Sequence, residues 1–170
     1  MERIVLVGFP GAGKSTVGKA LAHKMGLEFF DLDREIERFY HTSISDFLQK
    51  FDENFFRECE NKMLKMLIQK DNIVLATGGG APCFYNAMQQ INRQAISVYL
   101  KLSKESLCVR LLQAKKDRPL INASTPDELR NYIEKTLEIR EPIYEQAHII
   151  TKGESINVSS LVAVIRGGEN

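Results

Sequence analysis

GFPGAGKST, residues 8–16, is the stretch of sequence that decides the fold. It fits the pattern G-x-x-x-x-G-K-[ST], follows the apolar run 3–7 and opens a segment with apolar residues at helical spacing. In such a loop, glycines let backbone N–H groups turn inward around a β-phosphate. Lys14 then reaches the β- and γ-phosphate oxygens, and the Ser15 hydroxyl ligates Mg²⁺. The stretch therefore predicts a strand, a phosphate-binding loop and a helix; the alternative is an ordinary glycine-rich turn with a solvated lysine.

Apolar runs alternate with longer amphipathic stretches along the rest of the chain. The runs predict five strands, at residues 3–7, 28–32, 73–76, 95–100 and 148–151. Helical patterns begin near Lys14, Asp33, Ser43, Glu53, Phe84, Ser103, Pro126 and Ser155. Because strands separated by helices connect through right-handed crossovers, this order predicts an α/β fold with a five-stranded parallel sheet covered on both faces. Ligands of such sheets bind at the carboxyl ends of the strands, so the residues that follow each strand are candidate site residues.

Length and composition indicate one globular domain spanning residues 1–170. Its 23 Lys+Arg against 22 Asp+Glu give a net charge of +1, so no overall field attracts nucleic acid or an anionic membrane. The apolar runs are far shorter than the roughly 20 residues of a membrane span. The first residues, MERIVLVG, contain no small-residue cleavage site. Cys59, Cys83 and Cys108 have no CxxC spacing and indicate neither a disulfide framework nor a zinc site, so we expect a protein of the reducing cytoplasm.

Two aspartates follow the second apolar run. The segment FFDLD places Asp31 and Asp33 at the expected carboxyl edge of the sheet. Because their two-residue spacing turns both side chains the same way in extended backbone, one carboxylate could support Mg²⁺ and the other a substrate hydroxyl. The alternative for Asp33 is the N-cap of a helix over residues 34–40.

A charged pair stands on a predicted helix in FFRECE, residues 55–60. At helical spacing Glu60 falls about 40° from Phe56, inside the apolar arc, and Arg57 lies at the edge of that arc. A carboxylate on an apolar face needs a partner, and the i,i+3 spacing lets Glu60 hold the Arg57 guanidinium in a fixed pose for a ligand carboxylate. The alternative is an ion pair on the helix surface, worth a few tenths of a kcal/mol.

Two later segments add candidate substrate contacts. Gly78, Gly79 and Gly80 follow the third strand and let a ligand approach the backbone, although a tight connection to the next helix would also use them. Arg140 falls within about 20° of Leu129 on the apolar stripe of the last long helix. There it is either a bidentate clamp for an anionic substrate or an arginine that snorkels to solvent.

The longest polar stretch is QAKKDRPLINAS, residues 113–124, which predicts a mobile loop because its proline resists helix continuation. A loop that closes over a bound nucleotide could bring Arg118 onto the γ-phosphate and exclude water.

Six segments together resemble the shikimate kinase family. GFPGAGKST, FFDLD, FFRECE, TGGGA, RPL and REPIYEQA stand in the order and spacing of that family, from the first strand to about residue 150. The resemblance implies a three-layer P-loop kinase of the nucleoside-monophosphate-kinase type with sheet order 2-3-1-4-5. It also implies transfer of the ATP γ-phosphoryl group to the 3-hydroxyl of shikimate, in aromatic amino-acid biosynthesis. The expected partners are then shikimate, ATP and one Mg²⁺ per subunit, and the expected state is a monomer.

The resemblance also implies a role for each candidate residue. The nucleotide site would comprise Gly11, Ala12, Gly13, Lys14, Ser15, Thr16, Arg110 and Arg118. The shikimate site, within a region of about 33–62 and beyond it, would comprise Asp33, Arg57, Glu60, Gly78, Gly79, Gly80 and Arg140. Ser15 and, through water, Asp31 would hold the metal; Lys14, Asp33 as the base, and Arg118 on a lid of about 113–124 would be catalytic. Residues 43–51 would move as a substrate-binding flap.

Other functions fit parts of the pattern. Gluconate kinase shares the expected fold, the phosphate-binding loop and a polyhydroxy acid substrate, but FFRECE and TGGGA argue against it. A nucleotide kinase would need base-binding features that are not evident. A nucleotide-binding regulator without activity would leave Glu60 and Arg140, both on apolar helix faces, without a ligand.

Overall fold

The computed structural model describes residues 2–114, 120–121, 123 and 125–167. Within them the strands form one parallel sheet in the order β2-β3-β1-β4-β5. Its strands are β1 (Arg3–Val7), β2 (Glu28–Asp31), β3 (Ile73–Ala76), β4 (Ile96–Lys101) and β5 (Ile149–Lys152). The predicted architecture and the implied strand order are both confirmed.

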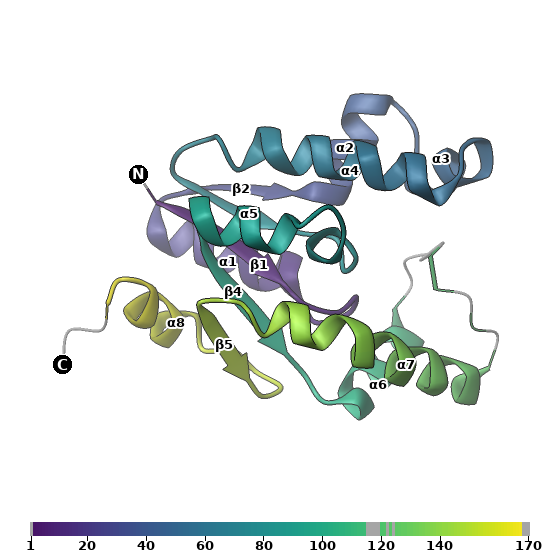
Figure 1. Ribbon diagram of the computed structural model, residues 1–170. Helices are drawn as coiled ribbons and strands as arrows, with labels where there is room; N and C mark the ends of the chain where they lie inside the picture. Colours follow the sequence, from purple (N-terminus) through teal and green to yellow (C-terminus); the bar gives the residue numbers. More distant parts are fainter. Residues whose placement is uncertain (1, 115–119, 122, 124, 168–170) are drawn as a thin grey trace.

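Helices connect successive strands and cover both faces of the sheet (Figure 1). The helical elements are α1 (Lys14–Met25), α2 (Leu32–Tyr40), α3 (Ile44–Lys50), α4 (Glu53–Leu67), the 3₁₀ turn η1 (Ala81–Cys83), α5 (Ala87–Gln94), α6 (Lys104–Gln113), α7 (Pro126–Tyr144) and α8 (Val158–Ile165). In the part of the chain that the structure describes, no helix combines the length and the apolar character that a membrane span requires.

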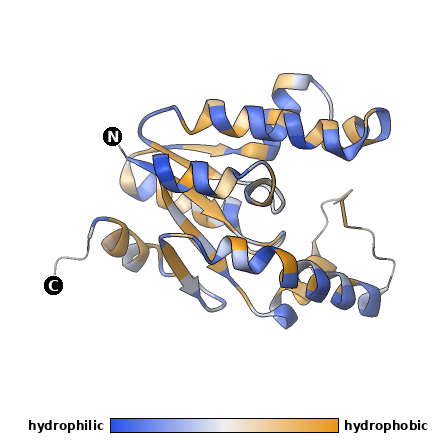
Figure 2. Cartoon of the chain, in the orientation of Figure 1, coloured by the Kyte–Doolittle hydropathy of each residue, from blue (hydrophilic) through white to orange (hydrophobic). Residues whose placement is uncertain are grey.

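Two hydrophobic clusters lie on opposite faces of the sheet. Successive strand side chains alternate between the faces, so Ile4 and Leu6 pack with α1, α6, α8 and most of α7, whereas Val5 and Val7 pack with α2, α4, α5 and the end of α7. Both sets are fully buried, as expected for a parallel sheet that helices cover on both sides. Figure 2 shows the resulting apolar strands between helices of mixed polarity.

The strand register brings the candidate residues to one edge. Asp31, the last residue of β2, is level with Ala76, the last residue of β3, and Ala76 is level with Leu6 near the end of β1. The loop after β1, the start of α2 and the glycines after β3 therefore begin side by side. This alignment assembles the site from segments far apart in the sequence.

Several predicted element boundaries are wrong by a few residues. The predicted helix near Phe84 is instead η1 followed by α5, because Tyr85 and Asn86 have positive φ angles of 54° and 55° that interrupt helical backbone. The last helix begins at Val158 rather than near Ser155, since the Asn157 side chain caps it by accepting from the Ser160 N–H. β2 ends one residue earlier than predicted, because α2 begins at Leu32.

Candidate active site

A cleft of about 400 Å³ opens where the loops after β1 and β3 and the start of α2 meet α4 and α7. Among the predicted site residues, the following line it: Gly11, Gly13, Lys14, Ser15, Thr16, Asp31, Asp33, Arg57, Glu60, Gly78, Gly79, Gly80, Arg110 and Arg140. Ala12 is buried and does not line the cleft, and its nucleotide contact stays a prediction. Arg118 lies outside the described residues.

The loop between β1 and α1 has the backbone that a phosphate requires. Gly11 and Gly13 adopt φ angles of 87° and 91°, in the left-handed region that side chains disfavour, and Gly13 is the N-cap of α1. The loop N–H groups and the positive end of the helix dipole thus face the cleft. Lys14 is 8% exposed and folds back over the loop, its Nζ donating to the carbonyls of Gly8 (2.7 Å) and Phe9 (3.0 Å).

Ser15 and Asp31 bring a hydroxyl and a carboxylate together at the entrance to the loop. The Ser15 Oγ donates to Asp31 Oδ2 at 2.5 Å. Asp31 is also the N-cap of α2, because its Oδ1 accepts from the Arg34 N–H at 3.4 Å. The alternative interpretation of Asp33 as that cap is therefore wrong.

Asp33 lies in the first turn of α2 and reaches the middle of the cleft. Gly78 shows how closely it approaches the next charged group: a Cβ added at Gly78 would lie 2.9 Å from Asp33 Oδ1 and 3.0 Å from Glu60 Oε1. The absence of a side chain at position 78 is what lets these two carboxylates face the same strand end. Their charges interact, since Asp33 contributes to raising the pKa of Glu60.

Arg57 and Glu60 form a buried pair. Their side chains are each 3% exposed, and the Arg57 guanidinium donates to Glu60 Oε2 at 2.7 Å. Burial raises the pKa of Glu60, and the Arg57 charge opposes that rise; the neighbouring carboxylates raise the pKa of Arg57 against its own burial. The alternative of a surface ion pair is wrong.

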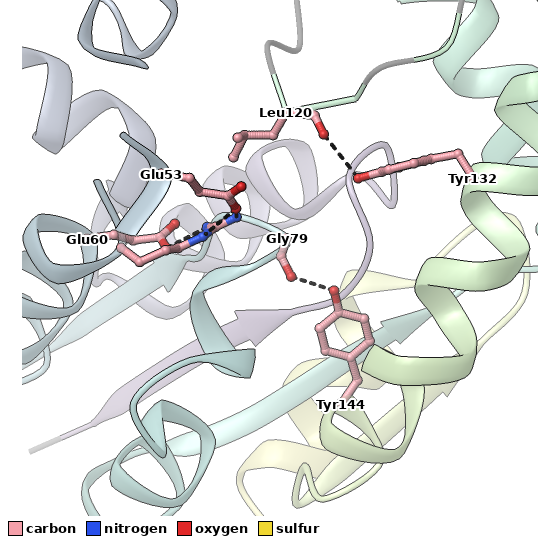
Figure 3. Close-up of polar contacts among 7 residues, drawn as sticks. Glu53, Glu60, Gly79, Leu120, Tyr132 and Tyr144 are labelled. Atoms are coloured by element: carbon pink, nitrogen blue, oxygen red, sulfur yellow. Dashed lines mark hydrogen bonds and ion pairs between the residues drawn. The ribbon is translucent and has the colours of Figure 1, made fainter. Parts of the chain in front are cut away.

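Two further groups hold the same guanidinium, and neither was predicted from the sequence. Glu53 accepts from Arg57 Nη2 at 3.1 Å (Figure 3). The Phe84 ring lies against the guanidinium, 4.5 Å from its carbon to the ring centroid. The i,i+4 spacing of Glu53 and Arg57 is a signal that could have indicated the first contact. No sequence signal indicates the second, because Phe84 comes from a different segment.

The glycine segment after β3 packs closely against the phosphate-binding loop and against Arg57. A Cβ at Gly79 would lie 2.4 Å from Pro10 Cδ of the phosphate-binding loop, and one at Gly80 would lie 2.6 Å from two nitrogens of Arg57. The carbonyl of Gly79 accepts from the Tyr144 hydroxyl at 2.5 Å (Figure 3). Within the described chain, the N–H groups of Gly79 and Gly80 donate to no protein acceptor although both residues line the cleft. Such N–H groups are positioned for a ligand.

The two remaining arginines lie at opposite ends of the cleft. Arg140 is half-buried on α7 and lines the cleft; burial raises the pKa of Glu60 and of Tyr144, and the nearby Arg140 charge opposes that rise in each. It therefore lies on the cleft wall, on the side of Arg57. Arg110, on α6, lies beside the phosphate-binding loop, where its Nη2 donates to the Glu154 carbonyl at 2.7 Å.

Comparison with known proteins decides the family. The family model described as shikimate kinase matches residues 10–166. The chain belongs to the shikimate kinase family. A shikimate kinase of Parabacteroides distasonis is 42% identical over 160 residues, which cover 94% of this chain and 92% of the relative.

Solved shikimate kinases have the same structure. The crystal structure from Bacteroides thetaiotaomicron superposes with a TM-score of 0.91 at 38% identity, covering 97% of this chain and 98% of that one. The Acinetobacter baumannii shikimate kinase, solved in complex with shikimate, has a TM-score of 0.89 at 33% identity over 99% of this chain and 95% of that one. This chain is accordingly an ATP-dependent kinase, and neither gluconate kinase nor an inactive nucleotide-binding regulator describes its family.

Proposed function

We propose that this cleft transfers the γ-phosphoryl group of ATP to the 3-hydroxyl of shikimate. The observation that carries the proposal is the meeting, in one cleft, of a phosphate-binding loop with an aspartate and two arginines. The loop fits a nucleoside triphosphate, and two arginines beside an aspartate fit a small acid that also bears hydroxyl groups.

On the nucleotide side, the backbone of residues 11–16 cradles the phosphates. When the nucleotide binds, the Lys14 ammonium exchanges its bonds to the loop carbonyls for bonds to the β- and γ-phosphate oxygens. There its charge stabilises the phosphoryl group during transfer. Arg110, beside Gly13, lies against the nucleotide; a Cβ at Gly13 would be 3.4 Å from its Nη1. We assign the lid arginine role to Arg118 on the family resemblance alone.

The Ser15–Asp31 pair fits Mg²⁺. A hydroxyl and one carboxylate are hard oxygen donors, and Mg²⁺ at nucleotide sites is bound through one or two such groups together with substrate phosphates and water. When bound, the ion would neutralise charge that develops on the phosphate oxygens. Ser15 would hold it directly and Asp31 through water.

On the acceptor side, Arg57 and Arg140 hold the carboxylate and Asp33 holds the hydroxyls. Asp33 accepts the proton of the attacking 3-hydroxyl as the new O–P bond forms and the bond to the β-phosphate oxygen breaks, leaving ADP. Glu60 and Glu53 keep the Arg57 guanidinium in place before shikimate arrives, so little side-chain conformational entropy is lost when the acid binds.

We also propose that the protein works as a monomeric, cytoplasmic enzyme with one domain over residues 1–170. A lid at about 113–124 and a shikimate-binding region at about 33–62 would be its moving parts. The three cysteines are free thiols, which suits a reducing compartment.

The deciding experiment measures ADP release from ATP and Mg²⁺ with shikimate, with gluconate, or without an acceptor. We expect rapid release only with shikimate, because the site is completed when the acceptor and the lid exclude water. Equal rates in all three reactions, or a preference for gluconate, would contradict the proposal.

A further inference from the structure

Gly79 is held between two parts of the protein that serve different substrates. One side of it contacts Pro10 of the phosphate-binding loop, and a Cβ at position 79 would lie 2.4 Å from Pro10 Cδ. The other side faces α7, whose Tyr144 hydroxyl donates to the Gly79 carbonyl at 2.5 Å. The position of this one peptide therefore depends on both walls of the cleft.

Tyr144 is fully buried. Its side chain is 0% exposed, and its ring packs against Tyr99 of β4 with centroids 5.2 Å apart. It stands one helical turn after Arg140 on α7. A hydrogen bond from its hydroxyl to the glycine segment therefore also fixes the position of Arg140, along the helix axis, relative to that segment. Burial raises the pKa of Tyr144 well above its usual value, which keeps the hydroxyl protonated and able to donate.

The bond also fixes the N–H of Gly80, a residue that lines the cleft. The Gly79 carbonyl and the Gly80 N–H belong to one planar trans peptide, so the N–H direction is set once the oxygen is held. The Gly80 N–H has no acceptor within the described chain, and Gly80 lies against the Arg57 guanidinium. We propose that Tyr144 is a positioning residue that aims the Gly79–Gly80 peptide, and the neighbouring Arg140, at the bound acid. The inference rests on the proposed function of the cleft.

Tyr144→Phe tests this with the ring retained. Loss of the hydroxyl lets the peptide rotate, so we expect the KM for shikimate to rise about fivefold to tenfold, the effect of one hydrogen bond. The KM for ATP should change less than about twofold and kcat less than about threefold, because the phosphate-binding loop keeps its own contacts.

Tyr99→Phe is the matched control. It removes a hydroxyl from the other ring of the same buried pair, one that donates to Glu141 at 3.2 Å, while Lys101 still binds Glu141 at 3.1 Å and Gly79 is untouched. Both variants should lose similar stability, but only Tyr144→Phe should raise the KM for shikimate. A second measurement, the rise in Tm on adding shikimate relative to each variant's own ligand-free Tm, remains informative even in a destabilised variant. We expect a smaller rise in Tyr144→Phe alone.

Three outcomes would overturn the inference: an unchanged KM for shikimate in Tyr144→Phe, an equal increase in both variants, or equal shifts of Tm with shikimate. An unmodified protein without shikimate-dependent ADP release would instead refute the proposed function, so the two failures are distinguishable.

Discussion

Asp31 and Asp33 are two residues apart, yet their surroundings give them different tasks. Asp31 already has two partners, the Ser15 hydroxyl and the Arg34 N–H, which place it at the phosphate-binding loop. Asp33 faces Gly78 and the charged group around Glu60. Because α2 begins between them, the extended backbone expected from their spacing is replaced by a helix start that sends one side chain to each half of the cleft.

Asp33→Asn should remove the base without unfolding the protein. The amide cannot take the proton of the attacking hydroxyl, and loss of a general base lowers rates by about 10²- to 10⁴-fold. Since Asp31 provides the helix cap, the fold does not depend on the Asp33 charge. Steady-state kcat with shikimate and Tm are the measurements. A folded variant with near-normal kcat would show that Asp33 is not the base.

Asp31→Asn should fail in a different way. Asparagine serves equally well as an N-cap, so Tm should change little. The weaker metal support should raise the Mg²⁺ concentration needed for half-maximal activity, and excess Mg²⁺ should restore part of the rate. Asp33→Asn, titrated with Mg²⁺ in parallel, should show no such recovery; recovery of both variants, or of neither, would contradict the division of roles.

Glu60 should make shikimate affinity depend on pH. Burial raises the pKa of Glu60 above its usual value. As the pH falls through this raised pKa, Glu60 takes up a proton and loses its charge interaction with Arg57. We expect the KM for shikimate to rise as pH falls through that ionisation. Glu60→Gln should have a raised KM near neutral pH and lack this part of the profile, whereas titration of the substrate's own carboxylate is common to both proteins. Identical profiles would refute the assignment.

The sequence predicted the Arg57–Glu60 pair because both residues lie on one helix, where angles follow from spacing. It did not predict Phe84 against Arg57 or the Tyr144 bond to Gly79, since those contacts depend on how separate segments pack. Tyr144 lies on the buried face of α7, and a buried position on a helix does not by itself indicate a polar partner. Arg118, predicted as the lid arginine, stays a prediction.

At the scale of elements, α7 is the longest helix of the described chain and carries both Arg140 and Tyr144 near its C-terminal end. Its start is fixed by a capping box in which Thr125 Oγ1 accepts from the Glu128 N–H and the Glu128 side chain accepts from the Thr125 N–H. The cap lies about 22 Å from Arg140 at a rise of 1.5 Å per residue. The capping box that stabilises α7 and the arginine proposed to bind the substrate therefore lie at opposite ends of the helix.

Thr125→Ala should separate these two properties. Loss of the cap should cost about 1 kcal/mol, which lowers Tm by about 2–4 °C in a protein of this size. The KM for shikimate should not change, because the far end of the helix is held by the core and by Gly79. Thermal unfolding and kinetics of Thr125→Ala are compared with Thr125→Ser, which keeps the hydroxyl. A raised KM in the alanine variant would mean that α7 shifts as a whole.

Hydrophobic periodicity was sufficient for the element order but not for every boundary. Ser43 and Ser103 are the N-caps of α3 and α6, and a serine before a helical pattern is a signal that can be recognised in the sequence. The interruption at Tyr85 and Asn86 carries no comparable signal, because left-handed backbone at a tyrosine is uncommon and is imposed here by the packed connection from β3 to α5. That connection also places Phe84 against Arg57.

At the scale of the whole molecule, a parallel sheet explains why one edge carries the chemistry. β1, β2 and β3 end at nearly the same level, and each is followed by a loop or helix start that contributes one part of the site. The two clusters on the faces of the sheet contain the apolar core and need no ligand to be complete. The alternation of apolar runs with amphipathic stretches along the chain made this architecture predictable. The strand order was predicted from the resemblance of the motifs to the family.

Removal of Mg²⁺ should therefore stop the reaction and leave the fold intact. Ser15 and Asp31 offer one hydroxyl and one carboxylate, so an Mg²⁺ ion held there would take its remaining ligands from nucleotide phosphates and water. We expect EDTA to abolish shikimate-dependent ADP release while the Tm of the ligand-free protein changes by less than about 1 °C.

With ADP and Mg²⁺ present at about 100 times Kd, binding should add about 2.7 kcal/mol of stability, and EDTA should remove part of the resulting rise in Tm. Excess Mg²⁺ added after EDTA should restore both activity and the ADP-dependent rise. A lower Tm on adding EDTA to the ligand-free protein would instead mean that a metal ion stabilises the fold itself, and the assignment of Mg²⁺ to the nucleotide alone would be wrong.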